Sequence, residues 1–242
     1  MSLEQEVTAL RGEIEELKKA NVLWGKKWCA AGDSLTEGAY KNAPEQNYRD
    51  ENGNKKNYAW FIGKRNHMEV VNGGICGSTL AVPKPEVEGD KHPFSVDRYR
   101  NIPQDAEYIT IWFGANDSFY SELGKPEDTE NTTFCGALNV VLPYLIQEHP
   151  FAKIGLIASF DCDAGFRNAV KQAALRYGIP CLDWMGDPNV PLIFGRDDSL
   201  GLDPEIKEFR IRTFRVSDTN GHPGVRAHEY ESTVVENFLR SL

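Results

Sequence analysis

Long apolar runs are missing from this 242-residue chain. No window approaches the roughly 20 apolar residues that a membrane-spanning helix needs, so we expect no membrane span. The first residues also lack the order of a basic stretch followed by an apolar one that marks a secretory signal peptide. A cytoplasmic protein is therefore the default expectation.

An excess of basic residues is also missing, because 27 Lys and Arg stand against 36 Asp and Glu, a formal net charge of -9. Nucleic-acid phosphates bind to basic surfaces, so this balance argues against nucleic acid as the main partner. A local basic run does alternate with apolar residues: Lys207, Arg210, Arg212 and Arg215. The alternation favours one solvated face of an extended segment, and the alternative is a wall that attracts an anionic substrate.

Cysteines are few, odd in number and without the close spacing of a metal site: Cys29, Cys76, Cys135, Cys162 and Cys181. This usage is typical of small buried apolar side chains in a reducing compartment, not of a disulfide framework. The acids Asp161 and Asp163 follow a predicted strand and indicate loop solvation or a helix cap. We expect neither a metal nor a cofactor.

The first 24 residues predict a separate amphipathic helix. Its apolar residues follow a 4-3-4-3 spacing at Leu3, Val7, Leu10, Ile14 and Leu17, and charged residues flank them. This spacing matches the a and d positions of a heptad seam. Either the helix forms a short coiled coil that makes a homo-oligomer, or it lies on its own domain.

Residues 25–242 predict one α/β domain in which short apolar strands alternate with helices. The expected strands are Trp28–Ala31, Met68–Asn72, Tyr108–Phe113, Lys153–Ala158 and Ile179–Leu182. The expected helices are Thr133–Glu148, Gly165–Tyr177 and Val225–Leu239. This alternation indicates a five-stranded parallel sheet covered on both faces. The long stretches Ala81–Gln104 and Trp184–Arg215 are expected to be lids or binding walls.

Gly-Asp-Ser-Leu at residues 32–35 places Ser34 just past the first predicted strand, where a helix should begin. Ligands bind at this edge of open α/β sheets, and the positive end of a helix dipole suits stabilisation of an oxyanion. The competing interpretation is that Ser34 only caps the helix, which is a common role for serine. These four residues alone do not choose between the two.

Three further segments occur in order along the chain: residues 70–79, residues 113–118 with Gly-Ala-Asn-Asp, and residues 217–224 with a His-Pro pair. Together with residues 32–35 they resemble the four motif blocks of the SGNH or GDSL hydrolase family, from Trp28 to the C-terminus. The resemblance implies a flavodoxin-like three-layer α/β/α sandwich. It further implies a serine nucleophile at Ser34.

The same resemblance implies roles for four other residues. The backbone N–H of Gly77 and the amide of Asn116 would join Ser34 in holding an oxyanion. His222 would be the general base, because the pKa of histidine ordinarily lies near neutrality, and Asp218 would orient its ring. The chain departs from the family here, with three residues instead of two between Asp218 and His222, and with Gly224 where an Asn is usual.

The implied activity is hydrolysis of a carboxylic ester through an acyl-enzyme. A carbohydrate O-acetylesterase is favoured by aromatic residues suited to sugar stacking, at Trp112, Phe119, Tyr120, Trp184 and Phe194. The alternative interpretation is that these aromatic residues belong to the core. Lipase, lysophospholipase or thioesterase activity is the alternative within the family. A non-catalytic module of a phage tail or surface assembly is the alternative outside it. The presence of Ser34, Asn116 and His222 together favours an enzyme.

Overall fold

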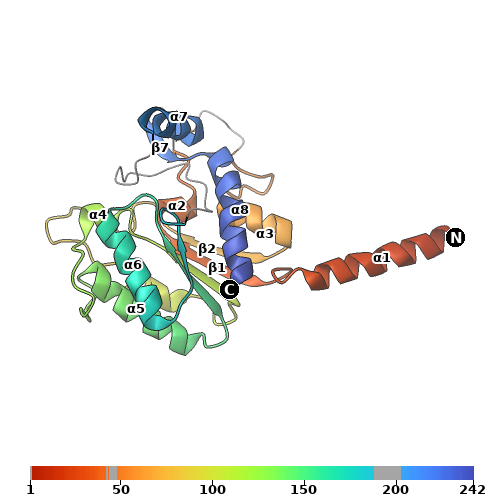
Figure 1. Cartoon of the computed structure of the whole chain (residues 1–242), viewed down its shortest axis with the longest axis horizontal. Coiled ribbons are helices and arrows are strands. Elements are labelled where there is room, and N and C mark those ends of the chain that lie inside the picture. Colours follow the sequence, from red (N-terminus) through yellow and green to blue (C-terminus); the bar gives the residue numbers. More distant parts are fainter. Residues whose placement is uncertain (1, 42, 44–47, 188–202) are drawn as a thin grey trace.

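Five parallel strands form the central sheet of the protein (Figure 1). The computed structural model describes residues 2–41, 43, 48–187 and 203–242. The strands are β1 (Lys27–Gly32), β2 (Glu69–Gly74), β3 (Tyr108–Trp112), β4 (Lys153–Ala158) and β5 (Cys181–Asp183). They confirm the predicted five-stranded parallel sheet.

The order of the strands across the sheet is β2-β1-β3-β4-β5. From β1 the chain moves outward to β2, and it then returns to the other side of β1 to form β3. In open α/β sheets, ligands bind in the crevice at the carboxyl ends of the strands where the direction of winding reverses. The ends of β1 and β3 therefore mark the place where a site is expected.

Helices cover both faces of this sheet. The helical segments of the domain are α2 (Ser34–Glu37), α3 (Tyr58–Asn66), η1 (Arg98–Asn101), α4 (Asp117–Tyr120), α5 (Phe134–Glu148), α6 (Ala164–Tyr177), α7 (Pro204–Phe214) and α8 (Val225–Ser241). Helices α5 and α6 pack on one face, and α3 and α8 pack on the other (Figure 1). The predicted three-layer α/β/α sandwich is thus confirmed.

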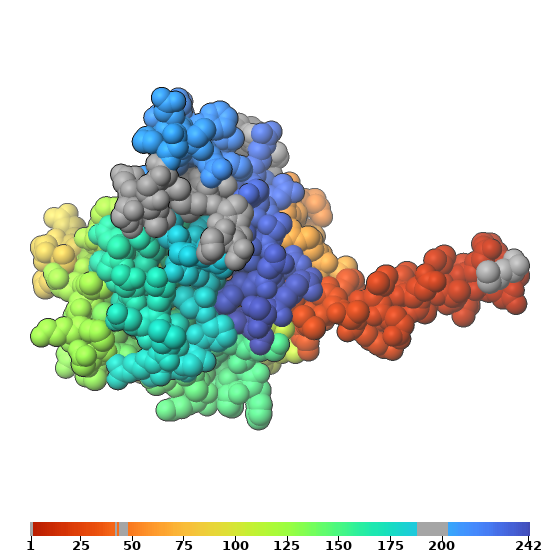
Figure 2. Space-filling view, viewed as in Figure 1, coloured from red at the N-terminus to blue at the C-terminus, as the bar shows by residue number. Residues whose placement is uncertain are grey.

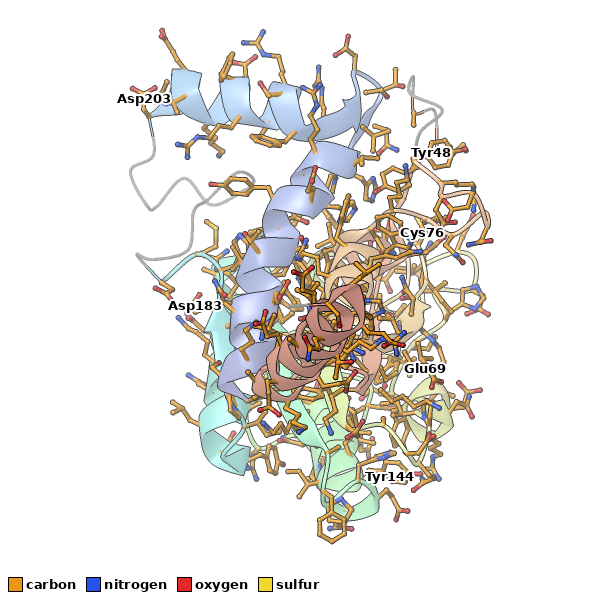
Figure 3. The ribbon with its side chains drawn as sticks, turned by 90° about the vertical axis from the view of Figure 1, so that its right-hand side faces the viewer. Tyr48, Glu69, Cys76, Tyr144, Asp183 and Asp203 are labelled. Carbon is orange, nitrogen blue, oxygen red and sulfur yellow. The ribbon has the colours of Figure 1, made fainter. Side chains whose placement is uncertain are left out.

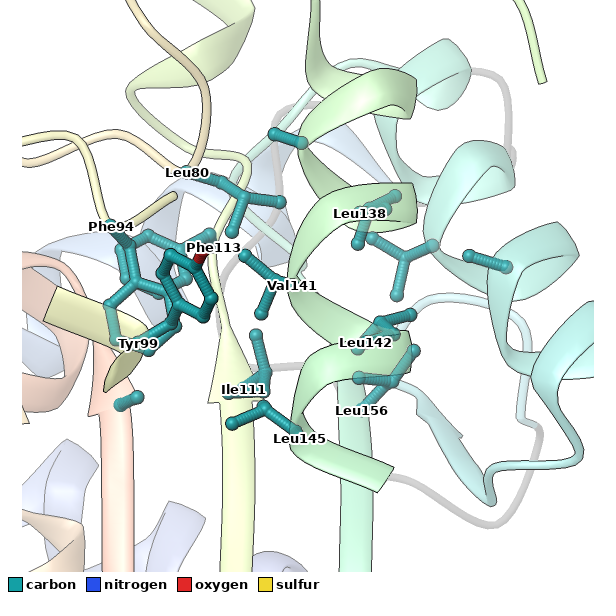
Figure 4. Packing of buried hydrophobic residues seen from close by; sticks show 14 of the residues in the cluster. Leu80, Phe94, Tyr99, Ile111, Phe113, Leu138, Val141, Leu142, Leu145 and Leu156 are labelled. Carbon is teal, nitrogen blue, oxygen red and sulfur yellow. The ribbon is translucent and has the colours of Figure 1, made fainter. Parts of the chain in front are cut away.

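Each face of the sheet has its own apolar core, because successive strand residues point to opposite sides. Cys29 and Ala31 of β1 face the α5 and α6 side, whereas Trp28 and Ala30 face the α3 and α8 side. Figure 4 shows the first core, where leucines and Val141 of α5 meet the side chain of Ile111 on β3. Burial on both faces explains why β1 and β3 are apolar almost throughout.

The N-terminal helix α1 (Leu3–Ala20) projects away from the domain (Figures 1 and 2). None of its residues is buried, so it does not lie on its own domain as one interpretation of the sequence expected. Its C-terminal end contacts the domain at Asn21, whose side-chain amide donates to Asn66 Oδ1 of α3 at 2.9 Å. Among the described residues, no helix combines the length and apolar character required to cross a membrane.

The basic run is helical, and the prediction of an extended segment there was wrong. Lys207, Arg210 and Arg212 lie in α7, and only Arg215 enters a strand. Asp203 caps this helix by accepting from the backbone N–H of Ile206, and Pro204 occupies its first turn (Figure 3). The capping aspartate and the proline in the first turn favour a helix, and they outweigh the alternation of basic and apolar residues that predicted an extended segment. The run belongs to the segment Trp184–Arg215 that was expected to be a lid or binding wall, and residues 188–202 of that segment lie outside the described residues.

A short antiparallel hairpin follows α7 and leads into α8. It consists of β6 (Arg215–Ser217) and β7 (Asn220–Pro223). Asn220 and His222 are two residues apart on β7, so they project to the same side of this strand. The hairpin thereby brings a late part of the chain against the loop that follows β1, since the Asn220 amide donates to the backbone oxygens of Ala39 and Lys41.

The contact between α2 and β2 depends on Gly74. A Cβ atom at this position would lie 2.2 Å from the backbone nitrogen of Glu37 and 2.7 Å from the backbone carbon of Thr36. At the neighbouring Gly73, the nearest atom to such a Cβ is the Ala30 carbonyl oxygen at 3.3 Å. The absence of a side chain at Gly74 therefore sets how closely the helix that begins with Ser34 approaches the sheet.

We expect Gly74→Ala to reduce the free energy of unfolding by about 1 to 3 kcal/mol or more, because the clash of the added Cβ with the backbone of α2 can be relieved only by moving that helix. Gly73→Ala is the matched control and should cost less than about 1 kcal/mol. Urea unfolding followed by tryptophan fluorescence measures both. Equal stability of the two variants would contradict this account of the packing.

Candidate active site

Ser34 is the first residue of α2 and follows the end of β1 after a single residue. The cap of this helix is Asp33, whose side-chain Oδ1 accepts the backbone N–H of Leu35 at 2.9 Å. Ser34 is therefore not the capping residue, and its hydroxyl makes a contact outside the helix. The side chain is nearly buried, with 5% of the residue exposed.

The hydroxyl of Ser34 lies 2.9 Å from Nε2 of His222. The two residues are 188 positions apart in the sequence, and the hairpin of β6 and β7 brings them together. This is the distance at which an imidazole nitrogen can accept a proton from a serine hydroxyl. The pair predicted from the motif blocks is thus in contact in the folded chain.

The other ring nitrogen of His222, Nδ1, lies 2.7 Å from Oδ1 of Asn220. The amide of Asn220 donates to the backbone oxygens of Ala39 at 2.9 Å and Lys41 at 2.7 Å. Because both of these partners are acceptors, the NH₂ group must face them, and the oxygen must face His222. Nδ1 is then the protonated nitrogen, which leaves the lone pair of Nε2 toward Ser34.

Asp218 does not occupy this place in the structure. Its side chain is 92% exposed and forms an ion pair with Arg215. Asp218 lies in the turn between β6 and β7, whereas the strand geometry puts Asn220 beside His222. Asn220 is the residue that sequence reasoning missed, and the unusual spacing between Asp218 and His222 was the signal for it.

Gly77 and Asn116 are joined through Ser78. The Asn116 amide donates to the backbone oxygen of Ser78 at 2.9 Å, and this bond uses one of its two N–H groups. Ser78 in turn donates through Oγ to the backbone oxygen of Gly32 at 3.4 Å. The backbone of Gly77 has a φ of +79°, in the left-handed region that favours glycine. These bonds bring the first three motif blocks to one edge of the sheet.

The buried carboxylate of Asp117 holds the loop of the second block in place. It accepts the backbone N–H groups of Leu80 and Ala81 and the hydroxyl of Ser121, at 3.0 to 3.2 Å. Burial raises its pKa to about 6 in spite of these donors. Asp117 therefore links the residues after β3 to the segment that follows Gly77 through buried hydrogen bonds.

Asp33 is also buried, and it is less well satisfied. Its Oδ1 accepts from Leu35, but its Oδ2 has no hydrogen-bond partner in the described part of the chain. Burial, with the negative charges of Asp161 and Asp117, raises the pKa of Asp33 to about 8. At neutral pH the folded protein consequently holds this carboxyl largely protonated.

Stability should fall with rising pH because of Asp33. The pKa is about 8 in the folded protein against an ordinary 3.8, so between about pH 4 and pH 8 the folded state keeps a proton that the unfolded state releases. We expect Asp33→Asn to gain stability relative to the wild type across this window, by up to about 1.4 kcal/mol per pH unit, and to keep a constant advantage above it. Chemical unfolding at several pH values measures this.

Asp218→Asn serves as the control, because it makes the same Asp-to-Asn change at an exposed side chain. Parallel stability curves for wild type and Asp33→Asn would contradict the raised pKa.

Two of the aromatic residues expected to stack against a sugar are core residues. Trp112 and Trp184 are buried and stack on each other with ring centroids 5.3 Å apart. Phe119 is exposed, next to Tyr120, and Phe194 lies outside the described residues. The expectation for Trp112 and Trp184 was therefore wrong, since strand and core packing place both rings inside the domain.

A cavity of about 770 Å³ lies between α3 and the outer edge of β2. Glu37, the last residue of α2, and Gly74 line it, so it begins beside the helix of Ser34. The remaining lining residues include polar, charged, aromatic and apolar side chains: Asn54, Lys55, Asn57, Trp60, Gly63, Lys64, His67, Met68, Val70 and Asn72. Its walls are thus mixed in polarity, and they do not form an apolar tunnel.

No protein-family model and no curated protein sequence matches the chain. Solved structures do match it along most of its length. A Lactobacillus plantarum protein shares 24% identity at a TM-score of 0.64, with 90% of this chain and 98% of that chain covered. A Bacteroides uniformis protein described as a GDSL-like lipase shares 18% identity at a TM-score of 0.60, with 90% and 97% covered.

A family two carbohydrate esterase from Clostridium thermocellum is similar at 15% identity and a TM-score of 0.55, with 89% of this chain and 63% of that chain covered. At these identities the likeness concerns the fold. The chain has the fold of GDSL-type hydrolases, which supports the resemblance to the SGNH or GDSL family that its motif blocks predicted.

Proposed function

We propose that the protein is a serine esterase of the SGNH type, and that its substrate is an acyl ester of a carbohydrate. The observation that carries the proposal is the 2.9 Å contact between Ser34 Oγ and His222 Nε2 at the carboxyl edge of the sheet. The similar structures described as lipases and carbohydrate esterases support ester hydrolysis as the general reaction.

In the proposed reaction, Nε2 of His222 takes the proton of the Ser34 hydroxyl as its oxygen attacks the ester carbonyl. The backbone N–H groups of Ser34 and Gly77 and the amide of Asn116 donate to the resulting oxyanion. Collapse of the tetrahedral intermediate releases the alcohol, which takes the proton from His222, and leaves an acyl-serine. A water molecule activated by His222 then releases the acid.

Asn220 takes the orienting role in this proposal. Its oxygen accepts from Nδ1 of His222, and its NH₂ group is held by two backbone carbonyls. A neutral amide fixes the ring and its tautomer, but it stabilises the imidazolium less than a carboxylate would. The geometry therefore supports His222 as a well-placed base whose protonated form is stabilised only modestly by Asn220.

The carbohydrate preference has two supports. The cavity beside α2 offers amide side chains and the indole of Trp60, which suit hydroxyl groups and a sugar face. Two of the similar structures are described as a family two carbohydrate esterase and a carbohydrate acetylesterase family member. A small acyl group such as acetyl fits a site without an apolar tunnel.

Ser34→Ala should lower the hydrolysis of a short-chain nitrophenyl ester by about 10³-fold or more, because the nucleophile is lost. Ser241→Ala, a serine at the far end of α8, is the control and should keep full activity. The same assay on acetylated sugars, longer acyl esters and acyl thioesters tests the substrate class, with acetylated sugars expected to be cleaved fastest. Unchanged hydrolysis in Ser34→Ala would show that Ser34 is not the nucleophile, and an inactive wild type would favour a non-catalytic module.

Asn220→Ala should lower kcat by about 10²-fold, the lower end of what a general base contributes, because His222 loses the group that sets its tautomer. Asp218→Ala should stay close to the wild type, since the Asp218 side chain points into solvent. Steady-state kinetics on both variants, with circular dichroism to verify folding, measures the difference. A greater loss in Asp218→Ala than in Asn220→Ala would reject this assignment.

A further inference from the structure

Helix α1 carries an apolar stripe that no described residue covers. Its five apolar residues are Leu3, Val7, Leu10, Ile14 and Leu17, and their exposed fractions range from 40% at Val7 to 78% at Leu3. A free helix of this length is only marginally stable in water, and Gly12 in its middle weakens it further. Burial of the stripe against a partner would supply the missing stability.

The spacing of the stripe defines a heptad register. Leu3, Leu10 and Leu17 fall at d positions, and Val7 and Ile14 fall at a positions. In parallel coiled coils, β-branched residues at a combined with leucine at d favour two strands. The apolar pattern therefore fits a second copy of the same helix.

The charges beside the stripe fit the same partner. In this register Glu6 and Glu13 occupy g positions, and Arg11 and Lys18 occupy e positions. In a parallel dimer in register, a g residue faces the e residue five positions further along the other helix. Every such pair between Glu6 and Arg11, and between Glu13 and Lys18, then has opposite charges. An antiparallel pair would instead place Glu6 against Glu13.

Lys18 is free to exchange its partner at small cost. In the single chain its Nζ bonds the exposed Glu15 at 2.7 Å and lies 5.6 Å from the centre of the half-buried Trp24 ring. Exposed ion pairs of this kind contribute little to stability. We propose that α1 pairs with the α1 of a second copy as a parallel, in-register, two-stranded coiled coil.

The fold leaves room for this pairing. Helix α1 projects away from the domain and joins it ahead of β1, whereas Ser34 follows the opposite end of that strand (Figures 1 and 2). Two domains carried on paired helices would therefore keep their sites open. The inference is independent of the proposed esterase activity, and activity per chain should not change on association.

Sedimentation of the full chain tests the dimer. The wild type should sediment with twice the monomer mass and dissociate on dilution, because the seam has only five layers. Glu6→Lys with Glu13→Lys should be monomeric, as should Arg11→Glu with Lys18→Glu, and mixing the two double variants should restore a dimer. Glu15→Lys with Glu16→Lys changes the same charge off the seam and should remain dimeric.

A wild type that is monomeric at every concentration, or a trimer, would overturn the proposal. So would a double variant at Glu6 and Glu13 that dimerises as well as its control.

Disulfide trapping tests the parallel direction. Leu3→Cys, in a Cys76→Ser background because Cys76 is exposed, should form a disulfide dimer on mild oxidation, since residue 3 faces residue 3 only when the helices run in parallel. The Cys76→Ser background alone should not cross-link. If the Leu3→Cys variant is a dimer by sedimentation but fails to cross-link, the helices do not run in parallel.

Discussion

The contact between Ser34 and His222 depends on a hydrogen-bonded clamp around Asn220. The amide of Asn220 reaches back to the backbone oxygens of Ala39 and Lys41, just after the helix that carries Ser34. This clamp joins the hairpin before α8 to the first strand–helix unit, and it also orients the ring of His222. One side chain thus links the two segments that carry Ser34 and His222 and fixes the tautomer of the histidine ring.

The loops around this site are built on buried carboxyl groups. Asp117 satisfies its oxygens with backbone and hydroxyl donors, so its burial ties the segment after Gly77 to the end of β3. Asp33 is less well satisfied, and burial raises its pKa to about 8. Its position is explained by the helix cap, because Asp33 binds the free N–H of Leu35 and leaves the hydroxyl of Ser34 to meet His222.

The two cores keep this arrangement rigid. Strands β1 and β3 are buried on both faces and end side by side where the winding of the sheet reverses. The loop residues that follow β1 and β3 therefore begin at fixed positions along one edge of the sheet. Helix α1 is the exception to this pattern of burial, since its whole apolar stripe faces solvent. In the proposed dimer, the same stripe of a second copy would cover it.

Local patterns in the sequence predicted the parallel sheet and its covering helices, because short apolar runs closed by turn residues have few alternatives to buried strands. The resemblance of the motif blocks to the SGNH or GDSL family was needed to predict that Ser34 and His222 meet, since Ser34 alone could equally be a helix cap. Only the tertiary structure decided which side chain orients His222. That choice depends on where a two-stranded hairpin turns and on backbone oxygens at Ala39 and Lys41, far away in the sequence.

The same limit explains the errors at Trp112 and Trp184. A sequence shows which residues are aromatic, but whether a ring lies in a cleft or in the core depends on packing between distant elements. Local signals also compete, as the basic run shows, where the cap at Asp203 and Pro204 produced a helix against the alternation of charge. The sequence alone determined the chemistry that is available, and three-dimensional contact determined which groups can use it.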